Sequence, residues 1–259
     1  MSTSLAERMN HVSGSPTSAL IATVAELKRQ GKNVISLNVG EPDFGTPDYI
    51  KVAGIKAIAE NFTKYTPGSG ILELRQEIAK KLQKDNGIEY ALNEITTSVG
   101  AKQAIASSLM VIAGPGDEVL LPIPCWVSYT EMIRLAGAKP VFVPVRPDNY
   151  ELDLEAIEKA IGPNTKAIVI CTPNNPTGAV YREKDLRRLA ELAVEHDFFI
   201  VADEIYEKLV YDGAKHFSVA SISREVRDRT ITVNGFSKAY AMTGWRIGYA
   251  AARADVIKG

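Results

Sequence analysis

Residues that form metal centres and disulfides are scarce in this chain of 259 residues, which contains two cysteines and three histidines. Cys125 and Cys171 lie far apart in sequence, and this separation favours free buried thiols in a reducing compartment over a disulfide. His11, His196 and His216 do not have the spacing of metal ligands. We therefore expect no metal site.

Long apolar runs and a strong net charge are also missing. The longest apolar stretches, at 167–171 and 198–202, have the length of strands, and the chain starts with polar residues rather than a signal-type apolar block. The formal net charge is -1, and no basic run stands out. These features disfavour membranes and nucleic acids as partners and predict a cytoplasmic protein.

What the chain does contain is a regular alternation of strand-like and helix-like segments from residue 94 onward. Such alternation predicts βαβ units, an α/β fold and a mostly parallel sheet. The length allows one large domain, either alone or with part of a second. We expect strands at 95–99, 118–121, 139–143, 166–171, 198–203 and 230–233, with helices ending near residues 113, 136, 161 and 196.

In the first ninety residues the strand–helix alternation is absent, and mainly helices are expected. Apolar residues on one face indicate a helix that ends at Gly31, and two further helices are expected at about 47–61 and 71–86. A short apolar run at 34–37 predicts a strand. The segment after it, 38–47, is too rich in glycine and proline to be regular.

Lys238 lies just past the expected strand 230–233, at the edge where open α/β sheets bind ligands. An isolated lysine is most often a solvated surface charge. Here small residues flank the lysine, and Arg246 follows eight positions later in a segment without acidic residues. A reactive amine near a guanidinium suits a ligand with a carbonyl and a phosphate, and pyridoxal phosphate (PLP) carries both.

The stretch resembles the lysine signature of class I PLP-dependent aminotransferases, the aspartate aminotransferase group, at Gly235, Lys238, Arg246 and Gly248. Some members carry a serine three residues before the lysine, where its hydroxyl contacts the phosphate, but this chain has Gly235. The resemblance covers essentially all 259 residues, whereas the family's chains run well beyond this length. We therefore expect the N-terminal portion of a longer enzyme, with 1–45 contributing to a small domain and 46–259 forming the large PLP-binding domain.

The resemblance implies that five side chains surround the cofactor's ring. Lys238 would bind the cofactor covalently and act as the general base, and Trp126 would stack on the pyridine ring. Asp203 would keep the ring nitrogen protonated. Asn175 and Tyr206 would hydrogen-bond the ring oxygen. Taken alone, Trp126 could be a core aromatic, Asp203 a helix cap and Asn175 part of a turn.

The resemblance also implies a phosphate site. Gly100, Ala101 and Lys102 begin a helix whose free N–H groups and dipole would favour an anion, and Arg246 would complete the site. Many helices begin this way with nothing bound. Tyr65, which lies in a turn, would reach the phosphate of a neighbouring subunit and so imply a homodimer.

On the substrate side, Gly40 matches a glycine whose backbone faces the bound amino acid, with Trp126 and Asn175 nearby. The same segment could be a plain linker. The resemblance implies transfer of an amino group from an L-amino acid, either aspartate or a related dicarboxylic or aromatic one, to a 2-oxo acid such as 2-oxoglutarate. Two alternatives stay open: a PLP-binding fragment without transaminase activity, and a lyase or decarboxylase on the same scaffold.

Overall fold

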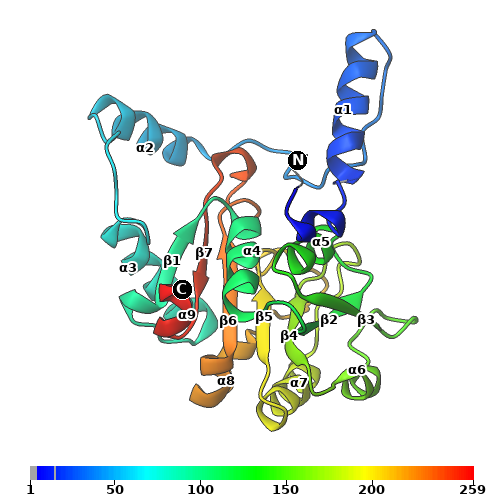
Figure 1. The fold of residues 1–259 in the computed structure, drawn as a ribbon. Helices are drawn as coiled ribbons and strands as arrows, with labels where there is room; N and C mark the ends of the chain where they lie inside the picture. The colour runs from blue at the N-terminus through cyan, green and yellow to red at the C-terminus, as the bar shows by residue number, and fades with distance from the viewer. Residues whose placement is uncertain (1–4, 15) are drawn as a thin grey trace, which may run out of the picture.

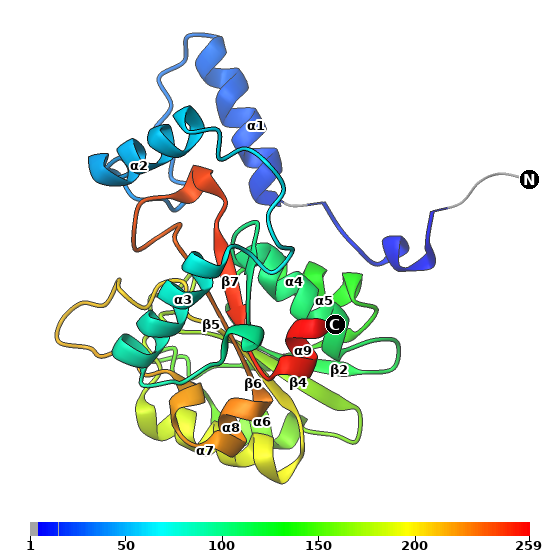
Figure 2. The same ribbon diagram turned by 90° about the vertical axis from the view of Figure 1, so that its left-hand side faces the viewer.

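The structure is a computed structural model that describes residues 5–14 and 16–259. Within these residues, seven strands form one sheet with helices packed on both of its faces, as Figures 1 and 2 show. The expected α/β class is therefore confirmed. No helix of the described part combines the length and the apolar character needed to cross a bilayer.

The order of the strands in the sheet is β1-β7-β6-β5-β4-β2-β3. Only β7 runs antiparallel to its neighbours, which are β1 and β6, so the sheet is mostly parallel, as expected. The bounds are β1 (Ile95–Ser98), β2 (Glu118–Ile123), β3 (Lys139–Pro144), β4 (Thr165–Cys171), β5 (Phe199–Asp203), β6 (Thr230–Gly235) and β7 (Gly248–Ala251).

The two faces of the sheet pack against two sets of helices. Successive strand residues point to opposite faces, so Val169 and Val201 join one core while Ile168, Ile170 and Ile200 join the other. This double burial explains why the strands are continuous apolar runs in the sequence. The first core is covered by α4 (Ala101–Ile112), α5 (Ser128–Leu135) and α9 (Ala254–Lys258), and the second by α6 (Leu154–Ala160), α7 (Glu183–Glu195) and α8 (Arg224–Arg229).

A third, smaller core lies at the β1 edge of the sheet. Ile78 and Leu82 pack there with Ile95 and Tyr249. Ile78 belongs to α3 (Leu72–Lys81), and a π-helical turn, η2 (Leu82–Asn86), continues this helix. The expected helix at 71–86 is therefore present, with a wider last turn from which Asn86 donates a hydrogen bond to Glu204.

The N-terminal helices extend away from this body. Figures 1 and 2 show α1 (Pro16–Arg29) and α2 (Asp48–Ala59) above the end of the sheet where β6 and β7 are joined. The expected strand at 34–37 is wrong, because this segment is irregular and Ile35 and Leu37 are 85% and 92% exposed. A strand needs a neighbour for its backbone hydrogen bonds, and none of the described strands runs beside these residues.

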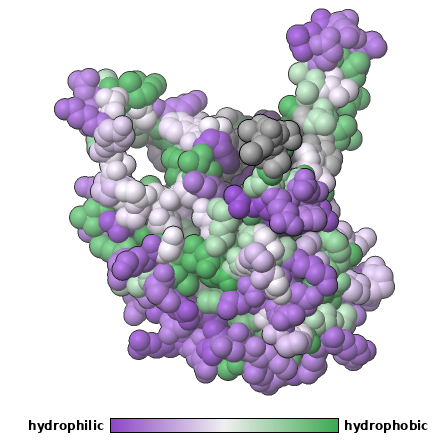
Figure 3. Space-filling model, in the orientation of Figure 1, coloured by the Kyte–Doolittle hydropathy of each residue, from purple (hydrophilic) through white to green (hydrophobic). Residues whose placement is uncertain are grey.

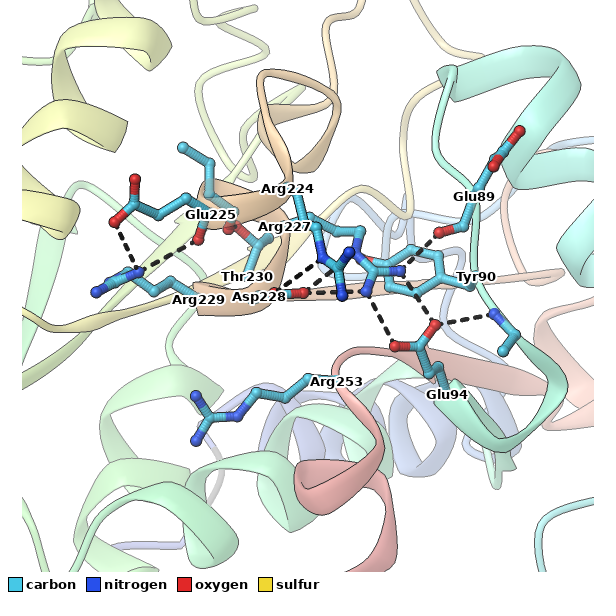
Figure 4. A network of polar contacts seen from close by, with 12 residues as sticks. Glu89, Tyr90, Glu94, Arg224, Glu225, Arg227, Asp228, Arg229, Thr230 and Arg253 are labelled. Carbon is cyan, nitrogen blue, oxygen red and sulfur yellow. Dashed lines mark hydrogen bonds and ion pairs between the residues drawn. The ribbon is translucent and has the colours of Figure 1, made fainter.

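Arg227 joins the start of β6 to the segment before β1, at the sheet end opposite the predicted site (Figure 4). Its guanidinium donates two hydrogen bonds of 3.0 Å to the Glu94 carboxylate and one of 2.7 Å to the Glu89 carbonyl. It also lies 5.0 Å from the centre of the Tyr90 ring. Because the Arg227 and Glu94 side chains are only 18% and 14% exposed, water competes little for this ion pair.

Replacing Arg227 with methionine is expected to lower the free energy of unfolding by about 3 kcal/mol, because Glu94 is left charged and poorly solvated. The measurement is urea unfolding followed by circular dichroism. Arg224→Met is the matched control, since the Arg224 side chain is 89% exposed and its ion pair with Asp228 spans 3.8 Å. Equal effects of the two variants would contradict this account of the Glu94 pair.

Candidate functional site

A cavity of about 410 Å³ opens at the carboxyl end of the parallel strands. Nine of the eleven residues predicted for the site line this cavity: Gly40, Ala101, Lys102, Trp126, Asn175, Asp203, Tyr206, Lys238 and Arg246. Asn38, Val39, Glu41, Tyr129, Ile205, Ser237 and Thr243 complete its wall. The sheet therefore gathers residues that are up to 208 positions apart between Asn38 and Arg246.

The topology explains this convergence. Asp203 is the last residue of β5, and Lys238 follows the end of β6 by three residues. Asn175 and Trp126 come shortly after β4 and β2, and Ala101 begins α4 directly after β1. These five strands run in the same direction and end at the same edge, so the segments that follow them meet there.

Asp203 forms the buried end of the cavity and is 3% exposed. Its carboxylate accepts a 2.6 Å hydrogen bond from the Tyr129 hydroxyl and a 3.1 Å bond from the Ile205 N–H. Burial raises the pKa of Asp203 to about 6, and these two hydrogen bonds partly oppose that rise. No lysine or arginine of the described residues forms an ion pair with this carboxylate, so the cavity offers a buried acid that suits a cationic ring nitrogen.

Lys238 lies half-buried on the wall of the cavity. Its ammonium donates a 2.6 Å hydrogen bond to the Gly40 carbonyl and lies 5.5 Å from the centre of the Tyr206 ring. Burial lowers the pKa of Lys238, Arg246 lowers it further, and the Glu41 and Asp203 carboxylates oppose the shift. A lowered pKa favours the neutral amine, which is the nucleophilic form.

Arg246 and Gly100 fit against each other where α4 begins. Gly100 has a φ of +77°, and a Cβ placed on it would lie 2.3 Å from Arg246 Nη2, so only glycine fits. Arg246 donates a 2.9 Å hydrogen bond to the Thr243 carbonyl. Gly100 itself does not line the cavity. It instead allows the guanidinium to lie beside the N-terminus of α4, so both face a potential anion.

Gly235 has no space for the serine that some aminotransferases carry at this position. A Cβ on Gly235 would lie 2.9 Å from the Ile247 carbonyl oxygen and 3.0 Å from the Gly248 Cα. Ser237, two residues later, is 8% exposed and lines the cavity. Ser237 was not among the predicted site residues, because the family pattern has its serine at the position of Gly235.

Aromatic and amide groups form the sides of the cavity. Trp126 meets Tyr129 edge to face with ring centres 5.3 Å apart, and Lys102 Nζ lies 5.4 Å from the centre of the Trp126 ring. Asn175 Nδ2 lies 3.4 Å from the Tyr206 hydroxyl. Burial raises the pKa of Tyr206 to about 12, so this phenol keeps its proton and can donate a hydrogen bond.

Tyr65 is fully exposed and lies outside the cavity. Its expected contact with the phosphate of a neighbouring subunit stays a prediction. Tyr129, which the sequence analysis missed, holds Asp203. Tyr129 lies in the first turn of α5, which begins at Ser128, so Trp126 precedes the helix and its spacing to Tyr129 carried no signal.

Other features of the described residues do not compete with this site. A larger cavity of about 810 Å³ lies between η1 (Glu7–Asn10) and β3, but it contains none of the predicted residues. Cys171 is buried and Cys125 partly buried, and both are free thiols.

Comparison with known proteins decides the family. Residues 32–259 match the family model described as aminotransferase class I and II. The chain belongs to this family. The enzymes of the family depend on PLP, which fits the buried acid, the lysine and the arginine that meet in one cavity.

Individual relatives agree with this assignment. The chain is 48% identical to an aspartate aminotransferase of Bacillus sp. (strain YM-2) and 51% identical to a probable aspartate/prephenate aminotransferase of Aquifex aeolicus. Each alignment covers 98% of this chain and 65% of the relative, so the chain spans about two thirds of these proteins. A solved aspartate aminotransferase of Thermus thermophilus with maleate aligns with a TM-score of 0.95 and 47% identity, over 99% of this chain and 66% of the other.

Replacing Asp203 with asparagine is expected to stabilise the cofactor-free chain in a pH-dependent way. The folded-state pKa, about 6, lies above the ordinary value of 3.8, so ionised Asp203 costs the folded state about 3 kcal/mol above pH 6. That cost shrinks as the pH falls from 6 toward 4. Thermal unfolding at pH 5 and pH 8 should show the larger gain at pH 8, and a gain that does not depend on pH would contradict the raised pKa.

Proposed function

We propose that this chain binds PLP in the cavity and that the protein moves an amino group from an L-amino acid to a 2-oxo acid. The observation that carries the proposal is the meeting of Asp203, Lys238 and Arg246 in one cavity at the sheet edge. An acid, an amine and a guanidinium are the three groups that the ring nitrogen, the aldehyde and the phosphate of PLP require.

When bound, PLP supplies an electron-accepting ring that stabilises the negative charge left when a substrate loses its α-proton. The protein's part is to hold that ring and to control charge around it. Asp203 would keep a positive charge on the ring nitrogen, and Tyr129 would fix the carboxylate's orientation. Trp126 would cover one face of the ring. Asn175 and Tyr206 would donate to the ring oxygen.

Lys238 would have two tasks, and its surroundings favour both. Its lowered pKa makes the neutral amine available for covalent attachment to the cofactor. The same amine, when free, would take up the α-proton of the substrate and deliver it to the reacting carbon of the cofactor rather than back to the α-carbon. The phosphate would lie between the start of α4, at Gly100, Ala101 and Lys102, and the Arg246 guanidinium.

The substrate class follows from the relatives rather than from the cavity. Their names include aspartate, prephenate and, for a Pyrococcus horikoshii structure at 44% identity, an aromatic aminotransferase. We propose aspartate as the amino donor and 2-oxoglutarate as the acceptor, with Gly40, Trp126 and Asn175 on the substrate side.

Absorption spectra of the PLP-loaded chain before and after addition of L-aspartate test this proposal. Product analysis separates a lyase or a decarboxylase from a transaminase. A spectrum that does not change when any amino acid is added would support a PLP-binding fragment without activity.

Lys238→Ala is expected to abolish turnover and the visible band of covalently bound PLP, since the attacking amine is gone. Arg246→Gln should keep the band at saturating PLP but weaken binding by about ten- to a hundredfold, because a charge-assisted contact to phosphate is lost. PLP titrations followed by absorbance measure both effects. Lys159→Ala removes an exposed lysine and serves as the control. Near-normal turnover of Lys238→Ala would overturn the mechanism.

We propose that 46–259 form the large domain, that 1–45 contribute to a smaller one, and that the protein is a homodimer in the cytosol. Thr46 supports the division, since its hydroxyl donates to the Ala241 carbonyl and accepts from Trp245 Nε1, which fixes the start of α2 to the lysine segment. Exposed apolar side chains on α2, visible in Figure 3, support a dimer: Val52, Ile55 and Ile58 are 61% to 70% exposed.

In a homodimer, Tyr65 is expected to serve the neighbouring subunit's phosphate. Tyr65→Ala and Lys238→Ala chains, each defective alone, should recover about a quarter of wild-type activity after mixing and exchange of subunits, because half of the dimers are hybrids and each hybrid has one intact site. Activity of the mixture, with light scattering to confirm dimers, is the measurement. No recovery from mixed dimers would contradict the shared site.

A further inference from the structure

Glu204 and Glu207 form a buried acidic pair on the side of the sheet away from the cavity. They are 1% and 7% exposed. Glu204 follows Asp203 directly, and its N–H still donates to the Val233 carbonyl of β6 at 2.8 Å. Adjacent residues in an extended strand point to opposite faces, so Asp203 enters the cavity while Glu204 points to the other face.

The two carboxylates are held by donors from two other parts of the chain. Ser218 donates to Glu204 at 2.6 Å, and His216 Nε2 lies 3.2 Å from the same carboxylate. Asn86, at the end of the π-helical turn, donates to Glu207 at 2.9 Å and to Glu204 at 3.3 Å. Polar groups that are buried this deeply need such partners.

A cationic side chain already pairs with one of these carboxylates. The Lys81 ammonium pairs with Glu207 and also donates a 2.7 Å hydrogen bond to Asn86 Oδ1. Ligand atoms of Glu204, Glu207 and His216 lie within 4.8 Å of one another, as in a cation site. Because the Lys81 ammonium and the Asn86 amide already face these carboxylates, the cluster is a hydrogen-bonded anchor rather than a metal site.

The anchor holds both ends of one short turn, residues 203–207. Within the turn, the Glu207 N–H donates to the Glu204 carbonyl at 3.0 Å, and the Ile205 N–H donates to the Asp203 carboxylate at 3.1 Å. The residues between the anchored glutamates, Ile205 and Tyr206, line the cavity. Movement of either end would therefore displace the acid and the phenol together.

We propose that Glu204 is a positioning residue, which acts on the cofactor site through the 203–207 turn and fixes Asp203 and Tyr206 from behind the sheet. Three donors from outside the turn converge on its carboxylate. Loss of these hydrogen bonds would make the 203–207 turn more mobile while the strands of the sheet stay paired. The cofactor part of this inference rests on the proposed function, whereas the mechanical part does not.

The test compares Glu204→Gln with Glu94→Gln in the cofactor-free chain. Both variants remove the charge of a hydrogen-bonded carboxylate, buried at Glu204 and partly buried at Glu94, but Glu94 belongs to the Arg227 cluster at the opposite end of β6. Amide hydrogen exchange by NMR is read at Ile205 and Glu207, with Leu120 in β2 as the reference for global unfolding. Glu204→Gln should speed exchange at the two turn amides at least tenfold relative to Leu120, and Glu94→Gln should leave this ratio within twofold of wild type.

A second readout is the dissociation constant for PLP, which should rise at least fivefold in Glu204→Gln and stay unchanged in Glu94→Gln. Ser218→Ala, which removes one donor, provides a milder variant if Glu204→Gln does not fold, and should move both readouts in the same direction. Equal exchange rates of the Ile205 and Glu207 amides, relative to Leu120, in the Glu204 and Glu94 variants would overturn the proposal. A wild-type chain that binds no PLP would instead overturn the proposed function, and the exchange data would still decide the role of Glu204.

Discussion

The carboxylate of Asp203 is the constraint on which the site depends. A buried acid without a cationic partner raises the free energy of the folded chain, and the same burial raises the pKa of Asp203. Three parts of the structure hold that carboxylate in place. Asp203 is the last residue of β5, the Tyr129 hydroxyl of α5 donates a hydrogen bond to it, and the Ile205 N–H of the 203–207 turn donates another. A cation supplied by a bound ring would turn the same carboxylate from a destabilising group into a stabilising one.

The sequence predicted the part of the site that follows from strand order. Apolar runs marked the strands, so the residues after them could be assigned to one edge, and Asp203, Asn175 and Lys238 lie there. Tyr129 was missed because its role arises from a contact 74 positions along the chain. The prediction of a strand at 34–37 was wrong because an apolar run alone does not indicate whether a neighbouring strand is available to pair with it.

The end of the sheet near β7 was harder to predict. β7 is only four residues long and reads as part of the lysine signature, so its antiparallel pairing left no clear pattern in the sequence. Its glycine is nevertheless informative. A Cβ on Gly248 would lie 2.4 Å from the Ala101 nitrogen, so this residue lets β7 approach the start of α4 closely.

The position of β7 also makes the proposed phosphate site depend on a contact between distant parts of the chain. Among the described strands, β1 pairs with β7 alone, although 149 residues separate Ser98 from Gly248, its partner in the sheet. The start of α4 follows β1, so this single antiparallel pairing also brings Gly100 against Arg246. Closing so long a loop costs more chain entropy than pairing strands that are neighbours in sequence. The rest of the fold must therefore offset that cost for the two halves of the site to meet.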